Sequence, residues 1–478
     1  MSIGSALSNA LSGLGAAAKS AELISSNVSN ALTPGYAKRD LIVSSRHSAQ
    51  GGVKIDGVLR HENTVVINER RLANAKNEHS SARSLFFDNL INVIGEPGSG
   101  KTLSDDISNL ESKLIEASGL PKDTNRLQGV FNAARTVAQR FNKISHGIQQ
   151  ERLQADNSIN EQVRALTFSL NALKKLNRQL VTVQSGSENT ANLMDERNQL
   201  LDKISKIIPV KIFDRGEGKI SIYSTSGQML LDSDIAKISF EPTRRINSHS
   251  DVKTNTLSKL LVQGQANASN FDLKLTGGTL AEAFEIRDVI APKVQSKLDD
   301  LAMHIAKTLG DPEIDPSLGE SDPGLFTDRG VKATSDNRVG LSARLEINAK
   351  VDPSKGGALW RIREGMGIAS SIDEGSSDLL VSLAAALHSN PSASHEEISI
   401  FDQTSFFLSN ITLQSDDAET EASFHSSFLR GLKLREQSDA VNTDQEMQHL
   451  LQVKQAFAAN AKVIKAVDEM LSLILKLK

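Results

Sequence analysis

Apolar residues recur along the first part of the chain at alternating steps of four and three. They are Ile3, Leu7, Ala10, Leu14, Ala17, Ala21, Ile24, Val28 and Ala31. This spacing places them along one face of a helix, as in a coiled-coil seam. Four of the nine are alanine, and the opposite face is mostly Ser, Asn and Gly. We therefore expect a helix that is marginal alone and that orders when other helices cover it.

The C-terminal part of the chain repeats the spacing with larger side chains. Its seam consists of Leu450, Val453, Phe457, Asn460, Ile464, Val467, Leu471 and Ile474. The tetrapeptide TDQE from Thr443 to Glu446 matches a capping box, which predicts where this helix begins. The two seams predict that the chain ends pair as a coiled coil, with Asn460 fixing the register. The remaining apolar positions favour contacts with further copies; they are Val463, Met470, Leu473, Leu475 and Leu477.

Helical periodicity also dominates the interior of the chain. The longest predicted helix spans residues 125–184, lacks proline, and would reach on the order of 90 Å. Further helices are predicted near residues 64–94, 103–114, 191–208, 280–309, 378–388 and 398–435, with a kink at Pro292. A period of two predicts short strands at residues 210–213, 220–223, 228–231 and 271–275, and a second β-rich patch at residues 341–362.

The fold class that follows is mainly α and elongated, with a coiled coil of the terminal helices and small inserted β-rich parts. We predict three domains. Residues 1–45 with 440–478 form a terminal coiled-coil domain, and residues 46–209 with 276–310 and 366–439 form a helical bundle. Residues 210–275 and 311–365 form β-containing outer inserts.

Composition narrows the function classes. The net charge of −4, without a dense Lys/Arg run, argues against a nucleic-acid partner. The absence of cysteine excludes disulfides, thiolate nucleophiles and zinc–thiolate sites. The ten histidines lack metal-binding spacing, and no nucleophile motif occurs. We expect no enzymatic activity, no cofactor and no metal.

The hydropathy pattern predicts neither a membrane span nor a cleaved secretory signal. No window approaches the roughly eighteen consecutive apolar residues that a span requires. The first basic residue is Lys19, and Ser and Gly interrupt the apolar positions before it. The amphipathic ends nevertheless leave a secreted helical effector or pore protein as one alternative.

Residues Gly95–Thr102 read GEPGSGKT and match the phosphate-binding loop pattern GxxxxGK[ST]. Such a loop needs a parallel sheet, with a second strand that ends in an aspartate for magnesium. The chain offers no alternation of strands and helices. Nucleotide binding is therefore the alternative interpretation, and a Gly-rich loop between helices is the favoured one.

A second loop, DPEIDPSLGESD from Asp311 to Asp322, has acidic spacing that could suggest calcium binding. The EF-hand pattern requires glycine at its sixth position, where this chain has Pro316. A solvated loop is the favoured interpretation.

The segment SSNVSNALTPGY, from Ser25 to Tyr36, resembles the signature of the axial proteins of the bacterial flagellum. Further blocks resemble the FlgK family of flagellar hook-associated proteins and occur in that family's order. They are IGEPGSGKTLSDDISNLESKLIEAS, RLQGVFNAARTVAQRFNKIS, DERNQLLDKISKIIPVKI, FDLKLTGGTLAEAFEIRDVIAPKVQSKLDDLAMHIAKTL and AVNTDQEMQHLLQVKQAFAANAKVIKAVDEML.

This resemblance implies a non-enzymatic structural subunit at the junction of hook and filament, with a hook or rod axial protein as the alternative. It implies extracellular location in the flagellum after type III export, without a cleaved signal. The implied partners are further copies in a ring, the hook protein, a second junction protein, and an export chaperone at the C-terminal region. Asn27, Asn30, Pro34, Gly35 and Tyr36 then join the two helical seams as the expected assembly interface.

Overall fold

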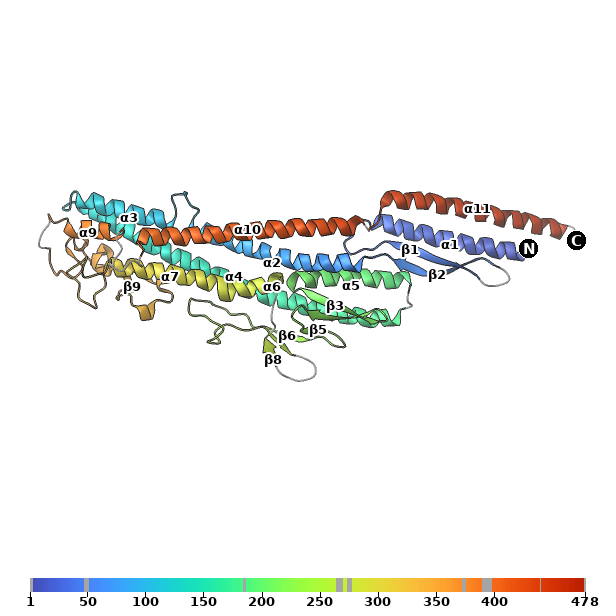
Figure 1. The fold of residues 1–478 in the computed structure, drawn as a ribbon, viewed down its shortest axis with the longest axis horizontal. Coiled ribbons are helices and arrows are strands. Elements are labelled where there is room, and N and C mark those ends of the chain that lie inside the picture. The colour runs from blue at the N-terminus through green and yellow to red at the C-terminus, as the bar shows by residue number, and fades with distance from the viewer. Residues whose placement is uncertain are drawn as a thin grey trace.

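The computed structural model describes residues 3–46, 51–183, 186–263, 270–272, 277–371, 375–388, 398–438 and 440–476. The molecule is a rod built mainly of long helices, as the periodicity predicts (Figure 1). Helices α1 (Ile3–Ser29) and α11 (Thr443–Lys476) lie side by side at one end, where α1 begins and α11 ends. The other end carries α3 (Leu103–Ser118) and α9 (Asp378–Ala386).

Helices α1 and α11 run antiparallel, so the predicted pairing of the chain ends is present. Asn27 near the end of α1 bonds to Glu446 in the first turn of α11. One-third of the way along α1, a Cβ added to Gly13 would lie 2.8 Å from Nδ2 of Asn460. A glycine at this position therefore lets the polar seam residue of α11 approach the backbone of α1.

A hairpin of β1 (Arg39–Ser45) and β2 (Val53–Arg60) lies against α1. The strands pair antiparallel, from Arg39 opposite Arg60 onward, with a bulge between Ile42 and Val43. The backbone N–H of Val53 donates to Oγ of Ser12 at 3.1 Å. The hairpin thus gives α1 a second neighbour besides α11.

The middle of the rod is a helical bundle. It contains α2 (Thr64–Ile94), α4 (Thr124–Thr182), α5 (Glu188–Ile207), α6 (Gly278–Glu285), α7 (Ala291–Thr308), α8 (Arg361–Glu364) and α10 (Ile400–Ser438). The 59 residues of α4 confirm the longest predicted helix. Helix α10 lies along α2, and Leu429 and Leu432 bury against Ala73.

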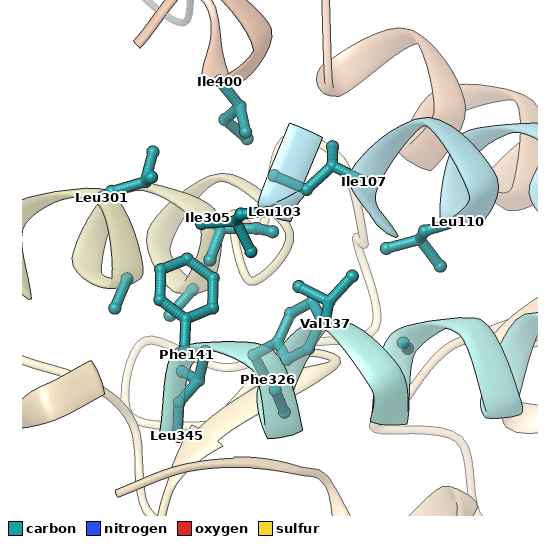
Figure 2. Close-up of a cluster of buried hydrophobic side chains, with 14 of the residues drawn as sticks. Leu103, Ile107, Leu110, Val137, Phe141, Leu301, Ile305, Phe326, Leu345 and Ile400 are labelled. Atoms are coloured by element: carbon teal, nitrogen blue, oxygen red, sulfur yellow. The ribbon is translucent and has the colours of Figure 1, made fainter. Parts of the chain in front are cut away.

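The main apolar core lies where α3, α4, α7 and α10 meet. Figure 2 shows Leu103, Ile107 and Leu110 of α3 facing Val137 and Phe141 of α4, with Leu301 and Ile305 of α7 and Ile400 of α10. Phe326 and Leu345 enter the same cluster from β9 (Phe326–Asp328) and β10 (Leu345–Ile347). Part of the segment 311–365 is therefore packed into the bundle core, and the division into three domains stays a prediction.

The predicted kink at Pro292 coincides with a change of helix type. A π-helical turn, η1 (Ile286–Ile290), joins α6 to α7, and Pro292 follows in the first turn of α7. Proline has no N–H to donate to the preceding turn, so a wider turn before it leaves the helix continuous.

The short strands form small antiparallel sheets beside α4. Strands β3 (Val210–Gly216), β4 (Lys219–Ser224) and β5 (Met229–Leu231) form one, as the period of two predicts. Strands β6 (Lys237–Ser239), β7 (Leu261–Gln263) and β8 (Asn270–Asp272) form another. No strand is predicted at the position of β7. The strand predicted at residues 271–275 is described only to Asp272.

The prediction of a second β-rich patch at residues 341–362 is wrong. Its one strand is β10, paired with β9, and the rest of the segment is largely short helical turns. These are η3 (Leu341–Ala343), η4 (Ala349–Val351), η5 (Pro353–Lys355) and α8; η2 (Ser335–Asn337) precedes them. The buried apolar residues Leu341, Val351 and Ile362 belong to the core of the bundle, so their spacing reflects contact with helices.

Candidate assembly site

Asn27 is the polar centre of the terminal unit, by which we mean α1, α11 and the β1–β2 hairpin. Its side chain is fully buried and uses all its hydrogen-bonding capacity. Nδ2 donates to the carbonyl oxygen of Arg39 and to Oε2 of Glu446, both at 2.9 Å. Oδ1 accepts from the backbone N–H of Arg39 at 3.0 Å and the hydroxyl of Tyr36 at 2.8 Å. One amide therefore joins α1, the following turn, β1 and α11.

The turn Thr33-Pro34-Gly35-Tyr36 directs the chain from α1 into β1. The N–H of Tyr36 donates to the carbonyl of Thr33 at 3.2 Å. Gly35 has φ +81°, which matches the third residue of a type II turn with proline before it. A Cβ on Gly35 would also lie 2.9 Å from Cγ of Gln199, whose amide donates to the carbonyl of Pro34 at 3.0 Å. The turn therefore docks on α5.

Glu446 faces the interior, although the TDQE pattern predicts that it caps its own helix. Its side chain is 1% exposed, accepts from Asn27, and lies 3.1 Å from Nζ of Lys38. The N-cap of α11 is instead Asn442, whose Oδ1 accepts from the N–H groups of Asp444 and Gln445. The predicted start of α11 is correct, but the predicted capping residue is wrong because Glu446 serves the contact with α1.

Charged side chains clamp the terminal unit to the bundle. Asp195 of α5 binds Arg39 of β1 and also Arg60 of β2, whose NH2 lies 2.8 Å away. Within the bundle, next to this contact, Asp202 of α5 binds Arg70 and Arg71 of α2 at 2.8 and 2.7 Å. All four arginines are largely buried, so these pairs are shielded from solvent.

Arg197 lies on the same helix as Asp195 and is affected by the positive charge where the terminal unit meets the bundle. Burial, with Arg60 and Arg71 nearby, lowers the pKa of its guanidinium to about 10. Its NH1 donates to the carbonyl of Gly218 at 3.0 Å. Several buried arginines therefore lie close together where the hairpin meets α2 and α5. The carboxylates of Asp195 and Asp202 compensate their positive charge.

The predicted seam residues of α1 are covered to different degrees. Ile24 is buried, whereas Ile3, Leu7, Leu14, Val28 and Asn30 are half-buried. In the turn, Gly35 and Tyr36 are half-buried and Pro34 is exposed.

On α11, Val467 is buried, and Leu450, Val453, Asn460 and Ile464 are half-buried. Phe457, Leu471 and Ile474 are 41%, 40% and 52% exposed, because a single partner helix covers one side of α11. The seams therefore meet, and they stay incompletely covered in one chain.

A second set of α11 residues adds to this uncovered area. Val463, Met470, Leu473 and Leu475 are exposed as predicted, and Leu451 joins them; Leu477 lies outside the described residues. We call these five exposed residues with Phe457, Leu471 and Ile474 the terminal apolar surface. Large apolar side chains exposed in this number on one helix indicate a site of contact with other molecules.

The two loops that resemble ligand sites are structural. Gly95–Thr102 follows helix α2, and Thr102 forms a capping box with Asp105 at the start of α3. A phosphate-binding loop follows a strand, whereas this loop follows a helix. The alternative of nucleotide binding therefore lacks the strand that it requires. In the loop from Asp311 to Asp322, Asp311 and Asp315 accept from N–H groups two residues later, and Asp322 accepts from that of Gly319. These carboxylates hold the turns of the loop itself.

One cluster of possible metal ligands lies outside the terminal unit, and residue spacing did not predict it. His79 of α2 approaches Glu282 and Glu285 of α6 with ligand atoms within 4.8 Å of one another. Arg83 binds both carboxylates, so their charge is already compensated. Burial raises the pKa of Glu282. The arrangement is that of an ion-pair cluster joining α2 to α6.

Sequence reasoning missed Glu446, Arg39 and Asp195 as members of the site. Their partners are 419, 12 and 156 residues away in the chain. No periodic signal links such positions. Glu446 lies four residues before Leu450, in line with the seam, but a carboxylate at that position does not indicate which distant residue it contacts.

Two protein families of the bacterial flagellum match parts of this chain. The family described as "Flagellar hook-associated protein FlgK helical domain" matches residues 87–311. The family described as "Flagellar basal body rod FlgEFG protein C-terminal" matches residues 438–477, which include α11.

Three curated relatives are named flagellar hook-associated protein 1. That of Bacillus subtilis is 21% identical over 94% of this chain and 93% of its own. Those of Salmonella typhimurium and Escherichia coli are each 22% identical, over 58% and 63% of this chain and 54% and 56% of their own. The chain thus spans nearly all of the first relative and about half the length of the other two.

Among solved structures, the flagellar hook junction protein FlgK from Burkholderia pseudomallei has a TM-score of 0.46 and 19% identity. The match covers 54% of this chain and 46% of that one.

Within the described residues, no helix combines the length and apolar character needed to cross a bilayer.

Proposed function

The chain belongs to the FlgK family of flagellar hook-associated proteins, structural proteins of the hook–filament junction, and we propose that it assembles there as a ring through its terminal unit. The observation that carries this proposal is the terminal apolar surface beside a partly covered seam. Fully burying one large apolar side chain is worth about 1.5–3 kcal/mol. The helices α1 and α11 of one chain leave these side chains exposed, and the terminal units of neighbouring copies bury them.

The terminal helices order together with assembly in this proposal. Most of the stability of a helix in water comes from packing of its apolar face, and the α1 seam is largely half-buried even when α11 is in place. The polar centre at Asn27 and Glu446 then selects one register among those that small alanines would allow.

The partners we propose follow from the family. They are further copies of the chain, the hook protein on one side of the ring, and a second junction protein on the other. An export chaperone engages the C-terminal region before assembly and keeps the apolar face of α11 covered. The chain reaches the outside of the cell by type III export without a cleaved signal, and acts as a structural component without catalysis.

Limited proteolysis tests the coupling of order to assembly. In the free subunit, residues 1–35 and 445–478 should be cut first, and in isolated flagella both segments should resist. Equal resistance in both states would contradict the proposal. Immunogold localisation tests the position: label at the tip of the hook is expected, and label along the hook shaft or in the rod would select a hook or rod axial protein instead.

A further inference from the structure

Helix α10 carries an exposed face that the bundle does not use. Phe406, Leu413, Phe424 and Phe428 are 63%, 59%, 65% and 54% exposed. With Asp417 and Glu421 they fall within about 80° of one another around the helix axis. We call these six residues the α10 stripe. The opposite side of α10, with Phe407, Ile411 and Leu429, packs into the molecule.

A groove of complementary chemistry lies on the outer face of the β3–β5 sheet. It has a volume of about 390 Å³ and is lined by Lys211, Phe213, Arg215, Tyr223, Ser224 and Gly227. The rings of Phe213 and Tyr223 meet edge to face with centroids 5.5 Å apart. We call this the β3–β4 groove. Its aromatic wall and two cations suit an aromatic side chain with a carboxylate close by.

The two surfaces lie on opposite edges of the rod. Figure 1 shows α10 along one edge and the β3–β5 sheet near the other, with the C-terminal half of α10 and the sheet at a similar level along the long axis. One molecule therefore cannot join its own two surfaces. Two molecules side by side can, and a contact between unlike surfaces propagates from copy to copy around a ring.

We propose that the α10 stripe of one copy docks into the β3–β4 groove of the next copy; this rests on the proposed function, which supplies the second copy. Phe424 and Phe428 enter between the groove's aromatic wall and its cations. Asp417 and Glu421 face Lys211 and Arg215. Within the part of the chain that the structure describes, Arg215 lies 3.5 Å from Asp232 and Glu421 lies 3.6 Å from His425. Asp417 and Lys211 form no ion pair there, so these two charges carry the complementarity.

The absence of cysteine from the chain makes a crosslinking test unambiguous. The doubly substituted chain Asp417→Cys, Lys211→Cys should give a ladder of dimers, trimers and larger species when isolated hook–filament junctions are oxidised, because each copy joins two neighbours. The matched control is Arg430→Cys with Lys211→Cys, since Arg430 is exposed on α10 but lies well off the stripe. This control should remain monomeric. A control that crosslinks equally, or a test variant that does not crosslink, would overturn the proposal.

Charge exchange provides the second measurement. Asp417→Lys alone and Lys211→Glu alone should each lower incorporation into junctions about tenfold, and the two together should restore it to within about threefold. Normal incorporation of both single variants would refute the docking while leaving the ring intact. Loss of the unsubstituted chain from hook tips would instead refute the proposed function.

Discussion

Replacing Asn27 by alanine should weaken assembly far more than the same change at Asn30. Asn27→Ala removes four hydrogen bonds and leaves the carboxylate of Glu446 and the backbone N–H and C=O of Arg39 buried without this partner. Asn30 bonds to the carbonyl of Ser26 and the hydroxyl of Thr33, both within its own turn. It is a matched control in residue type and helix position.

The magnitude follows from the lost contacts. A buried polar group left unsatisfied costs about 1–3 kcal/mol, and alanine recovers roughly 0.6 kcal/mol through its helix propensity. Four groups lose a partner, but Glu446 is still held by Lys38 and the Tyr36 hydroxyl by Ser26, so we expect a net loss of about 3 kcal/mol. This corresponds to about a hundredfold change in a binding constant.

The assay titrates purified subunits onto isolated hooks and measures the half-saturating concentration. If the terminal unit orders on assembly, Asn27→Ala should raise this concentration about a hundredfold, and Asn30→Ala less than about fivefold. Hydrogen exchange of α1 in the free subunit supplies the complementary measurement. There the two variants should both resemble the unsubstituted chain, because the polar centre has not yet formed.

The opposite pattern would refute this reasoning. If Asn27→Ala accelerated exchange in the free subunit about a hundredfold and left binding to hooks unchanged, the terminal unit would already be folded before assembly. Equal effects of the two variants in both assays would show that the polar centre does not control the register.

Three further predictions test the terminal unit, its contact with the bundle, and the bundle itself. Gly35→Ala should weaken the assembled terminal unit by about 1–2 kcal/mol through its positive φ and its contact with Gln199, whereas Gly15→Ala, which has open space, should stabilise α1 there by about 0.5–1 kcal/mol; the half-saturating concentrations on isolated hooks compare them. Asp195→Asn leaves the buried Arg39 without its anion and Arg60 with Glu62 alone, and should cost about 3–5 kcal/mol in chemical unfolding; a loss below about 1 kcal/mol would contradict its role. Burial raises the pKa of Glu151, so its contribution to stability is present below its ordinary pKa and is lost as the pH rises through the folded-state pKa. Glu151→Gln should therefore raise the melting temperature at about pH 7 and change it little at about pH 4; a fall at about pH 7 would reverse the assigned sign.

Elements with regular periodicity could be predicted from the sequence. The terminal seams and the long helix α4 follow from apolar spacing, since one face of each is buried along its length. The terminal helices meet through these faces. What the spacing did not predict is that Phe457 and Ile474 stay exposed, because coverage depends on how many helices surround α11.

Contacts between distant positions could not be predicted. Glu446 fitted a local capping rule, and the structure uses it instead for Asn27 at the other end of the chain. Residues 341–362 looked like strands because their apolar positions are closely spaced, but they contact the helical core from short turns. In both cases a tertiary contact outweighs the local pattern, and a single sequence contains no direct sign of it.

The bond between Asn27 and Glu446 joins residues 419 positions apart, and so it can form only after nearly the whole chain has been made. Helix α1 is synthesised before the bundle and its partner α11 after it. A prematurely terminated chain would contain most of the bundle but lack α11 and the terminal unit. Because the two halves of this small site lie on either side of the bundle in the sequence, a subunit that lacks α11 cannot form the surface through which we propose that the ring assembles.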